Sequence, residues 1–225
     1  SDEKRSLREM GTWSYEEKPP DKPVIKSRWV FKTKTNLDGS TKTKARLVAK
    51  GYNQIKYENY DETFAPVIRK ESLRYLISYA LANNLELKHL DVETAFLNGK
   101  LEEEIYMELP EGFEEEPRVV KLNKSLYGLK QSPRCWNKEI NNILINNSYH
   151  PTTSDPCIYI KKENEKIKGI IGLYVDDCLI VGEKEETREM KRILASNFKM
   201  KDLGELKLIL GIEVERNERE IRLFQ

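Results

Sequence analysis

Residues 172–183 read GLYVDDCLIVGE, with two adjacent carboxylates, Asp176 and Asp177, between two short apolar runs. Apolar runs of this length are typical of buried strands, so the stretch predicts a hairpin whose turn carries the aspartates. Like charges repel, and burial of an unpaired carboxylate costs on the order of several kcal/mol. A bound metal ion is the simplest compensation, and a turn directs both side chains into one cleft, which a straight strand does not.

A third carboxylate is needed to hold two cations, and Asp91 is the best candidate because it lies at the end of the apolar strand predicted over residues 87–92. Oxygen ligands without histidine suit Mg²⁺ or Mn²⁺ better than zinc. Two such ions about 4 Å apart activate an attacking hydroxyl and stabilise a leaving pyrophosphate. From spacing alone an alternative stays open, in which Asp91 caps a helix and Asp176 and Asp177 lie in an ordinary loop.

Composition narrows the class of protein. The 225 residues are 38% hydrophobic, enough for a core in one or two domains. The chain lacks the roughly 18 consecutive apolar residues of a membrane span, which predicts a soluble protein without a membrane partner. Its N-terminus has no apolar segment that indicates secretion. The three cysteines form no CxxC pair, which argues against a disulfide framework and favours a reducing compartment. With only two histidines, carboxylates are expected to carry any chemistry.

The remaining pattern predicts an α+β fold. Apolar residues recur at helical spacing in 71–84, 132–147 and 184–198, and short strands of mostly antiparallel type lie between these helices. A regular βαβ repeat is absent from the sequence pattern. Residues 1–22 are polar and are expected to form an N-terminal arm or linker.

Residues 24–50 predict a hairpin with a cationic face. Odd positions are apolar and even positions are basic on both sides of the turn signal NLDGS at 36–40. The even-numbered cations are Lys26, Arg28, Lys32, Lys34, Lys42, Lys44, Arg46 and Lys50. Such a face suits phosphate groups, and the alternative is a solubilising surface.

Seven motifs together resemble the reverse transcriptase domain of Ty1/copia-type LTR retrotransposons, from about residue 12 to the C-terminus. They are, in the order of that family, SRWVFKTK, KARLVAKGYNQ, DETFAPV, LDVETAFLNGKLEEEIYM, SLYGLKQSPRCW, LYVDD and DLGELKLILGIEV. The resemblance implies a right-hand polymerase with an antiparallel palm sheet, helices on one face of that sheet, and no thumb. Fingers are expected over 23–66 and 99–131, and a palm over 67–98 and 132–225 with a primer-grip-like hairpin.

The resemblance also implies roles for the carboxylates. Asp91 resembles the first palm carboxylate, and Asp176 and Asp177 resemble the pair on the catalytic hairpin. Asp91 and Asp176 are expected to bind both ions, with Asp177 accessory and with the carbonyl of Val92 completing the nucleotide-side site.

Nucleotide-binding residues follow from the same resemblance. Arg46 is the first choice for gripping the triphosphate because a guanidinium binds phosphate oxygens in a bidentate way, and Lys32 is the second. Phe96 is expected under the sugar, where its ring collides with a 2′-hydroxyl; the alternative is a core phenylalanine. Gly128 permits close backbone approach. Tyr127 is expected to support the nucleotide, although retroviral relatives usually carry Gln at that position.

Template and primer contacts are expected from a further set of residues. They are Lys34, Lys44, Lys130, Gln131, Tyr174, Leu210 and Gly211, the last two in the turn that positions the primer. Lys199 or Lys201 is a candidate general acid for pyrophosphate, and the spacing does not decide between them.

The function expected from the resemblance is RNA- and DNA-directed DNA synthesis with two Mg²⁺ or Mn²⁺ ions. Expected partners are an RNA template, a DNA primer, dNTPs and the RNase H and integrase parts of a Pol polyprotein, in cytoplasmic virus-like particles. Two alternatives stay open: a fragment without a thumb that binds nucleic acid with little or no catalysis, and a two-metal nuclease that uses the same carboxylates.

Overall fold

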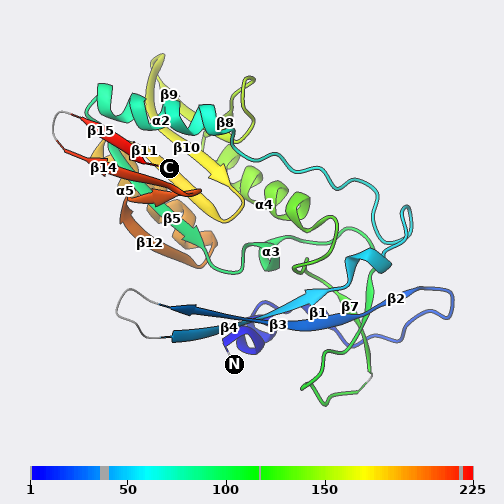
Figure 1. Ribbon diagram of the computed structural model, residues 1–225. Coiled ribbons are helices and arrows are strands. Elements are labelled where there is room, and N and C mark those ends of the chain that lie inside the picture. Colours follow the sequence, from blue (N-terminus) through cyan, green and yellow to red (C-terminus); the bar gives the residue numbers. More distant parts are fainter. Residues whose placement is uncertain (1, 36–40, 117, 218–219, 225) are drawn as a thin grey trace. The chain divides into compact units, whose positions relative to one another are not determined.

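A computed structural model describes residues 2–35, 41–116, 118–217 and 220–224, with the elements labelled in Figure 1. The chain divides into two compact units. Unit 1 comprises residues 1–65 and 94–139, and unit 2 comprises residues 66–93 and 140–225. The mixture of helices with mainly antiparallel sheets confirms the predicted α+β class.

Unit 1 contains two sheets among its described residues, of order β1-β7-β6-β2 and β3-β4. Its elements are α1 (Asp2–Glu9), β1 (Trp13–Ser14), β2 (Val24–Ile25), β3 (Ser27–Thr35), β4 (Thr41–Ala49), the 3₁₀ helix Gly51–Asn53, α3 (Ala95–Asn98), β6 (Tyr106–Glu108), β7 (Val119–Leu122) and the start of α4 (Ser132–Asn146). Helix α1 falls where a polar arm was expected. Its Leu7 is 1% exposed and packs in the apolar core of the unit, so this segment is part of the folded unit.

The basic hairpin predicted from the period-two pattern is β3–β4. Its register pairs Lys32 with Lys44 and Val30 with Arg46, which places these side chains on one face. On the other face Leu47 is fully buried, whereas Phe31 is 68% exposed. The apolar face is therefore covered toward the end of β4 and open nearer the turn. The turn signal at 36–40 and the side chain of Lys34 lie outside the described residues.

Unit 2 is built on an antiparallel sheet of six described strands, in the order β12-β5-β11-β10-β9-β8. Its strands are β5 (Glu86–Val92), β8 (His150–Pro151), β9 (Ile158–Glu163), β10 (Lys166–Tyr174), β11 (Asp177–Gly182) and β12 (Met200–Glu205). A further sheet comprises β13 (Leu208–Ile209), β14 (Ile212–Arg216) and β15 (Ile221–Phe224). The helices are α2 (Lys70–Ala82), the end of α4, and α5 (Lys184–Asn197).

Helices cover both faces of this sheet, and the expectation of helices on one face is wrong. A Cβ at Gly169 would lie 2.9 Å from Glu186 Cγ of α5, whereas a Cβ at Gly172 would lie 3.0 Å from Leu76 Cδ1 of α2. The two glycines stand three positions apart on β10 in unbroken register with β11, so they point to opposite faces. Glycine at both positions lets the helices approach closely.

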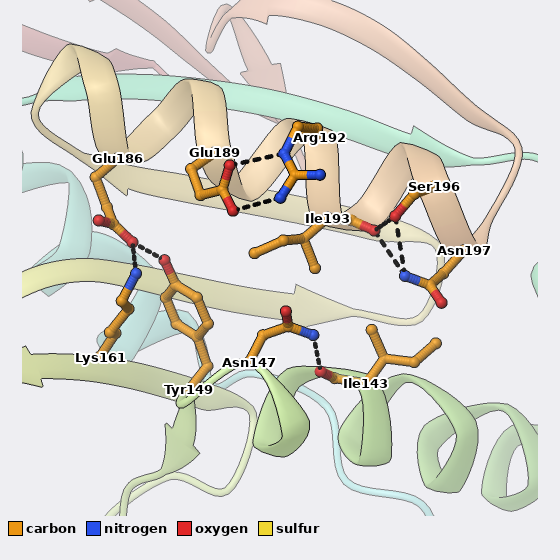
Figure 2. A network of polar contacts seen from close by, with 10 residues as sticks. All are labelled: Ile143, Asn147, Tyr149, Lys161, Glu186, Glu189, Arg192, Ile193, Ser196 and Asn197. Carbon is orange, nitrogen blue, oxygen red and sulfur yellow. Dashed lines mark hydrogen bonds and ion pairs between the residues drawn. The ribbon is translucent and has the colours of Figure 1, made fainter.

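A polar network fastens α5 to its neighbours in unit 2 (Figure 2). Glu186 forms an ion pair with Lys161 of β9, with 2.9 Å between Nζ and Oε1, and it accepts a hydrogen bond from the Tyr149 hydroxyl. Burial, followed by the contact with Glu186, raises the pKa of Tyr149. The phenol therefore stays protonated and donates this bond at neutral pH. In the part of the chain that the structure describes, every helix is too short or too polar to cross a bilayer.

Candidate active site

The hairpin formed by β10 and β11 carries the two adjacent aspartates, as the sequence predicts. Tyr174 and Asp177 are paired across it, and Val175 and Asp176 form the tight connection. Val175 has a φ of +53°, a left-handed conformation that costs a β-branched residue on the order of 1–2 kcal/mol. The backbone is thus strained at the point where the carboxylates are presented.

Strand β5 brings the third carboxylate to this hairpin. Asp91 and Asp177 are Cα partners in the β5–β11 ladder, and the Val92 amide donates a hydrogen bond of 2.8 Å to the carbonyl of Asp176. Residues directly opposite each other in an antiparallel pair place their side chains on the same face. Carboxylates that are 85 residues or more apart in sequence therefore meet at one end of the sheet.

The pKa of the buried Cys178 thiol also depends on the three carboxylates that meet here. Burial raises its pKa, and the negative charges of Asp177, Asp176 and Asp91, in that order, raise it further. All three carboxylates therefore lie close enough to one atom to disfavour a negative charge on it. The raised pKa also keeps this cysteine from acting as a thiolate nucleophile or ligand.

A histidine that the sequence analysis set aside contacts one of the three aspartates. His89 stands two residues before Asp91 on β5, on the same face, and it is 7% exposed. Its Nε2 lies 2.7 Å from Oδ1 of Asp177. The period-two spacing in HLD was the available signal, since alternate residues of a strand share a face.

The donor chemistry of this site fits a hard divalent cation, because three carboxylates supply oxygen atoms only. Among the described residues, no lysine or arginine forms an ion pair with Asp91 or Asp177. In the same described part of the chain, no group of three or more His, Cys, Asp or Glu side chains is placed to hold an ion. The backbone thus brings the three carboxylates to one end of the sheet, without a closed coordination sphere among the described side chains.

Three of the nucleotide-binding candidates contact one another within unit 1. The Phe96 ring lies 4.7 Å from the ring of Tyr127 in an edge arrangement, and the Arg46 guanidinium lies 5.2 Å from the same ring. Lys32 is exposed on the hairpin face that also carries Arg46. Tyr127 therefore stands between a cation suited to phosphate and a ring suited to a sugar.

Gly128 closely approaches another strand of the chain, and its expected contact with a nucleotide stays a prediction. Its φ is +90°, and a Cβ there would collide with the carbonyl oxygen of Ala49 at the end of β4. The Ala49 amide in turn donates a hydrogen bond of 2.7 Å to the carbonyl of Tyr127. This contact fixes Tyr127 beside the basic hairpin.

The expectation that Gln131 contacts template is wrong. Gln131 is 1% exposed, and its amide donates to the carbonyl of Asn59 at 2.7 Å and accepts from Gln54 Nε2 at 2.9 Å. A buried amide needs internal partners, and these contacts use both of its ends. The neighbouring Lys130 is half-buried, with its Nζ 3.1 Å from the Tyr60 hydroxyl.

The other template and primer candidates stay predictions. Lys44 is exposed beside Lys32, and Tyr174 lies opposite Asp177 at the end of β10. Leu210 and Gly211 have φ values of +50° and +77° and form the tight turn between β13 and β14.

The two candidate general acids lie in different surroundings. Lys199 forms an ion pair of 2.8 Å with Glu93, whereas Lys201 is the Cα partner of Asp91 in the β5–β12 ladder. Lys201 therefore shares a sheet face with Asp91. The register favours Lys201 over Lys199 as the lysine next to the carboxylates.

Comparison with known proteins shows a match to a protein-family model. The model of a family described as reverse transcriptase (RNA-dependent DNA polymerase) matches residues 10–225. The chain is 47% identical, over all of its length, to the retrovirus-related Pol polyprotein from transposon TNT 1-94 of Nicotiana tabacum, and 39% identical over 95% of its length to that from transposon RE1 of Arabidopsis thaliana. It is 31% identical over 95% of its length to the transposon Ty1-GR3 Gag-Pol polyprotein of Saccharomyces cerevisiae. It spans 17%, 15% and 12% of these relatives, respectively.

Proposed function

Because this chain belongs to the reverse transcriptase (RNA-dependent DNA polymerase) family, we propose that it catalyses template-directed DNA synthesis on RNA and DNA templates. The 3′-oxygen of a primer attacks the α-phosphorus of a dNTP and loses its proton. The bond from that phosphorus to the bridging oxygen breaks, and pyrophosphate leaves. The observation that carries the proposal is the pairing of Asp91 with Asp177 beside Asp176.

The carboxylates are the residues that would hold two Mg²⁺ or Mn²⁺ ions. Asp91 and Asp176 would be the main ligands of both ions, Asp177 would be accessory, and the carbonyl of Val92 would complete the nucleotide-side site. Such ions, when bound, lower the pKa of the attacking hydroxyl and stabilise charge on the leaving group. Asp91 and Asp177 stand on adjacent strands, so their separation is set by the sheet and not by a mobile loop.

The nucleotide-binding candidates in unit 1 are proposed to bind the incoming nucleotide. The proposed fingers remain residues 23–66 and 99–131, and the proposed palm, which includes Phe96, remains residues 67–98 and 132–225. Arg46 and Lys32 grip the triphosphate, Tyr127 supports the base or sugar, and Phe96 excludes a 2′-hydroxyl. Gly128 acts indirectly, through its contact with Ala49. Phe96→Ala is therefore expected to raise ribonucleotide incorporation, and unchanged sugar discrimination in primer extension would remove this assignment.

A further set of residues is proposed to contact nucleic acid. Lys44, Lys34 and Lys130 would meet template phosphates, and such contacts carry no base specificity. Tyr174 and the turn at Leu210 and Gly211 would position the primer end. Lys201 is proposed as the general acid. Further proposed partners are the RNase H and integrase parts of a Pol polyprotein, within cytoplasmic virus-like particles.

Primer extension on an RNA template with Mg²⁺ and dNTPs tests this function, with Asp176→Asn as the matched control. The variant keeps the size of the side chain and removes one charge. Extension by the wild type that is lost in the variant supports the polymerase. Tight binding of primer and template without extension supports a non-catalytic nucleic-acid-binding fragment. Degradation of nucleic acid without dNTPs supports a nuclease.

A further inference from the structure

His89 contacts one of the three aspartates, Asp177. Its Nε2 lies 2.7 Å from Oδ1 of Asp177, and its ring is 7% exposed within β5. His89 pairs with Leu179 and Asp91 pairs with Asp177, so the contact runs diagonally across the ladder on the face that carries both aspartates. Diagonal neighbours in a ladder lie within reach of long side chains.

The direction of this hydrogen bond follows from the chemistry of its partners. An ionised carboxylate has acceptor sites only, so the histidine nitrogen must donate. A neutral imidazole with its proton on Nε2 is sufficient for this. The bond takes one oxygen of Asp177 and leaves the second oxygen for another partner.

The Asp177 side chain lies where electrostatic repulsion favours its rotation, and the hydrogen bond from His89 opposes that rotation. It follows a strained tight turn and lies next to Asp176 in sequence and opposite Asp91 in the sheet, so two like charges repel it. A side chain in that position would rotate away from both neighbours unless a partner held it. His89 is rigid within a strand and buried, so it can fix the Asp177 side chain at a low entropic cost.

We propose that His89 is a positioning residue of the active site, which fixes the Asp177 carboxylate so that its second oxygen is presented to a divalent cation bound by Asp91 and Asp176. The inference rests on the proposed polymerase function, and it adds to the metal site a residue that orients a ligand without binding the metal itself. Outer partners of metal ligands orient those ligands, and their loss typically costs about 10–100-fold in metal affinity or activity.

Binding of Mn²⁺ alone, followed by electron paramagnetic resonance on the 225-residue chain, tests the proposal without nucleotide or catalysis. His89→Leu fills a similar volume in the strand with an apolar side chain and removes the hydrogen-bond donor. His89→Gln retains a donor. We expect His89→Leu to weaken Mn²⁺ binding by about tenfold, and His89→Gln to restore most of the affinity. His150→Gln is the matched control because His150 is an exposed histidine of the same unit, and it should bind as the wild type does.

A double-mutant cycle shows whether His89 acts through Asp177. Asp177→Asn alone should weaken Mn²⁺ binding, and adding His89→Leu to it should cause little further loss, since the two residues act as one group. Wild-type Mn²⁺ affinity in folded His89→Leu would overturn the proposal, and so would fully additive losses. Thermal unfolding establishes that each variant is folded, and His89→Phe, which also lacks a donor, replaces His89→Leu if the latter is not.

Failure of this inference can be told apart from failure of the proposed function. If Asp176→Asn abolishes extension while His89→Leu binds Mn²⁺ normally, the polymerase assignment stands and the role of His89 falls. If His89→Leu instead raises the metal concentration that gives half-maximal extension and leaves the half-maximal dNTP concentration unchanged, the positioning role is supported. A purely structural role would lower activity at all metal concentrations alike.

Discussion

Two carboxylate sites within unit 2 differ in how their charge is compensated. Glu186 on α5 has a lysine and a phenol as partners, at a side-chain exposure of 15% (Figure 2). Asp177 has a hydrogen bond from His89 at a side-chain exposure of 25%, and among the described residues it lacks an ion pair with a lysine or arginine. Asp177 also lies opposite a second carboxylate, Asp91.

The difference indicates what each site is for. A carboxylate whose charge is balanced inside the fold fastens two elements together, as Glu186 fastens α5 to β9. Asp91 and Asp177 converge and, among the described residues, form no ion pair with a lysine or arginine, so their repulsion raises the free energy of the native state and the binding of an external cation lowers it. Changes at the first site should therefore alter stability, and changes at the second site should alter cation binding and catalysis.

The largest expected effect is on catalysis. Asp176→Asn should lower the rate of primer extension by at least about 100-fold, since it removes a charge that stabilises the reaction. Extension assays measure the effect, and thermal unfolding establishes that the variant is folded. Glu186→Gln is the matched control and should extend primers at the wild-type rate when folded. Equal losses of activity in Asp176→Asn and Glu186→Gln would contradict the distinction between the two carboxylate sites.

The next effect is on stability. Glu186→Gln should lower the free energy of unfolding by roughly 1–3 kcal/mol, because Lys161 then lacks its partner in a partly buried position. Glu189 on the same helix pairs with Arg192 at 2.8 Å in an exposed position. Glu189→Gln should therefore cost less stability than Glu186→Gln does. Denaturant unfolding distinguishes the variants, and a larger loss from Glu189→Gln would contradict the structural role of Glu186.

A divalent cation should stabilise the wild-type chain in the absence of nucleotide. At ten times its dissociation constant, Mn²⁺ adds about 1.4 kcal/mol to the free energy of unfolding. Glu186→Gln should keep this increment, and Asp91→Asn should lose it. Thermal unfolding with and without the ion measures the increment. Retention of the full increment in Asp91→Asn would place the bound ion away from the three aspartates.

The smallest expected effect concerns packing beneath the Glu186 network. In Gly169→Ala the new methyl group would meet Glu186 Cγ and the flexible end of Met190, which should cost about 1 kcal/mol. Gly182→Ala is the matched control on the paired strand. A Cβ at Gly182 would be less crowded than one at Gly169, because its nearest neighbouring atom would be the carbonyl oxygen of Lys168 at 3.1 Å. Extension by both variants should remain at the wild-type rate. Loss of activity in Gly169→Ala would mean that this face of the sheet also supports catalysis.

The sequence by itself determined the α+β class, the basic hairpin and the hairpin that carries Asp176 and Asp177. Each of these depends on local periodicity or on turn residues, which neighbouring positions in the chain express directly. The family motifs likewise gave Asp91, Arg46 and Phe96 as candidates, because their order along the chain is specific.

Only the tertiary structure decided that Asp91 stands opposite Asp177, that His89 contacts Asp177, and that Gln131 is buried against Gln54 and Asn59. It also placed α2 and α5 on opposite faces of one sheet. These outcomes depend on strand register and on which helix covers which face, and both are settled by packing between segments far apart in sequence. Local periodicity indicates that a residue faces a sheet surface, but it does not identify what lies across from it.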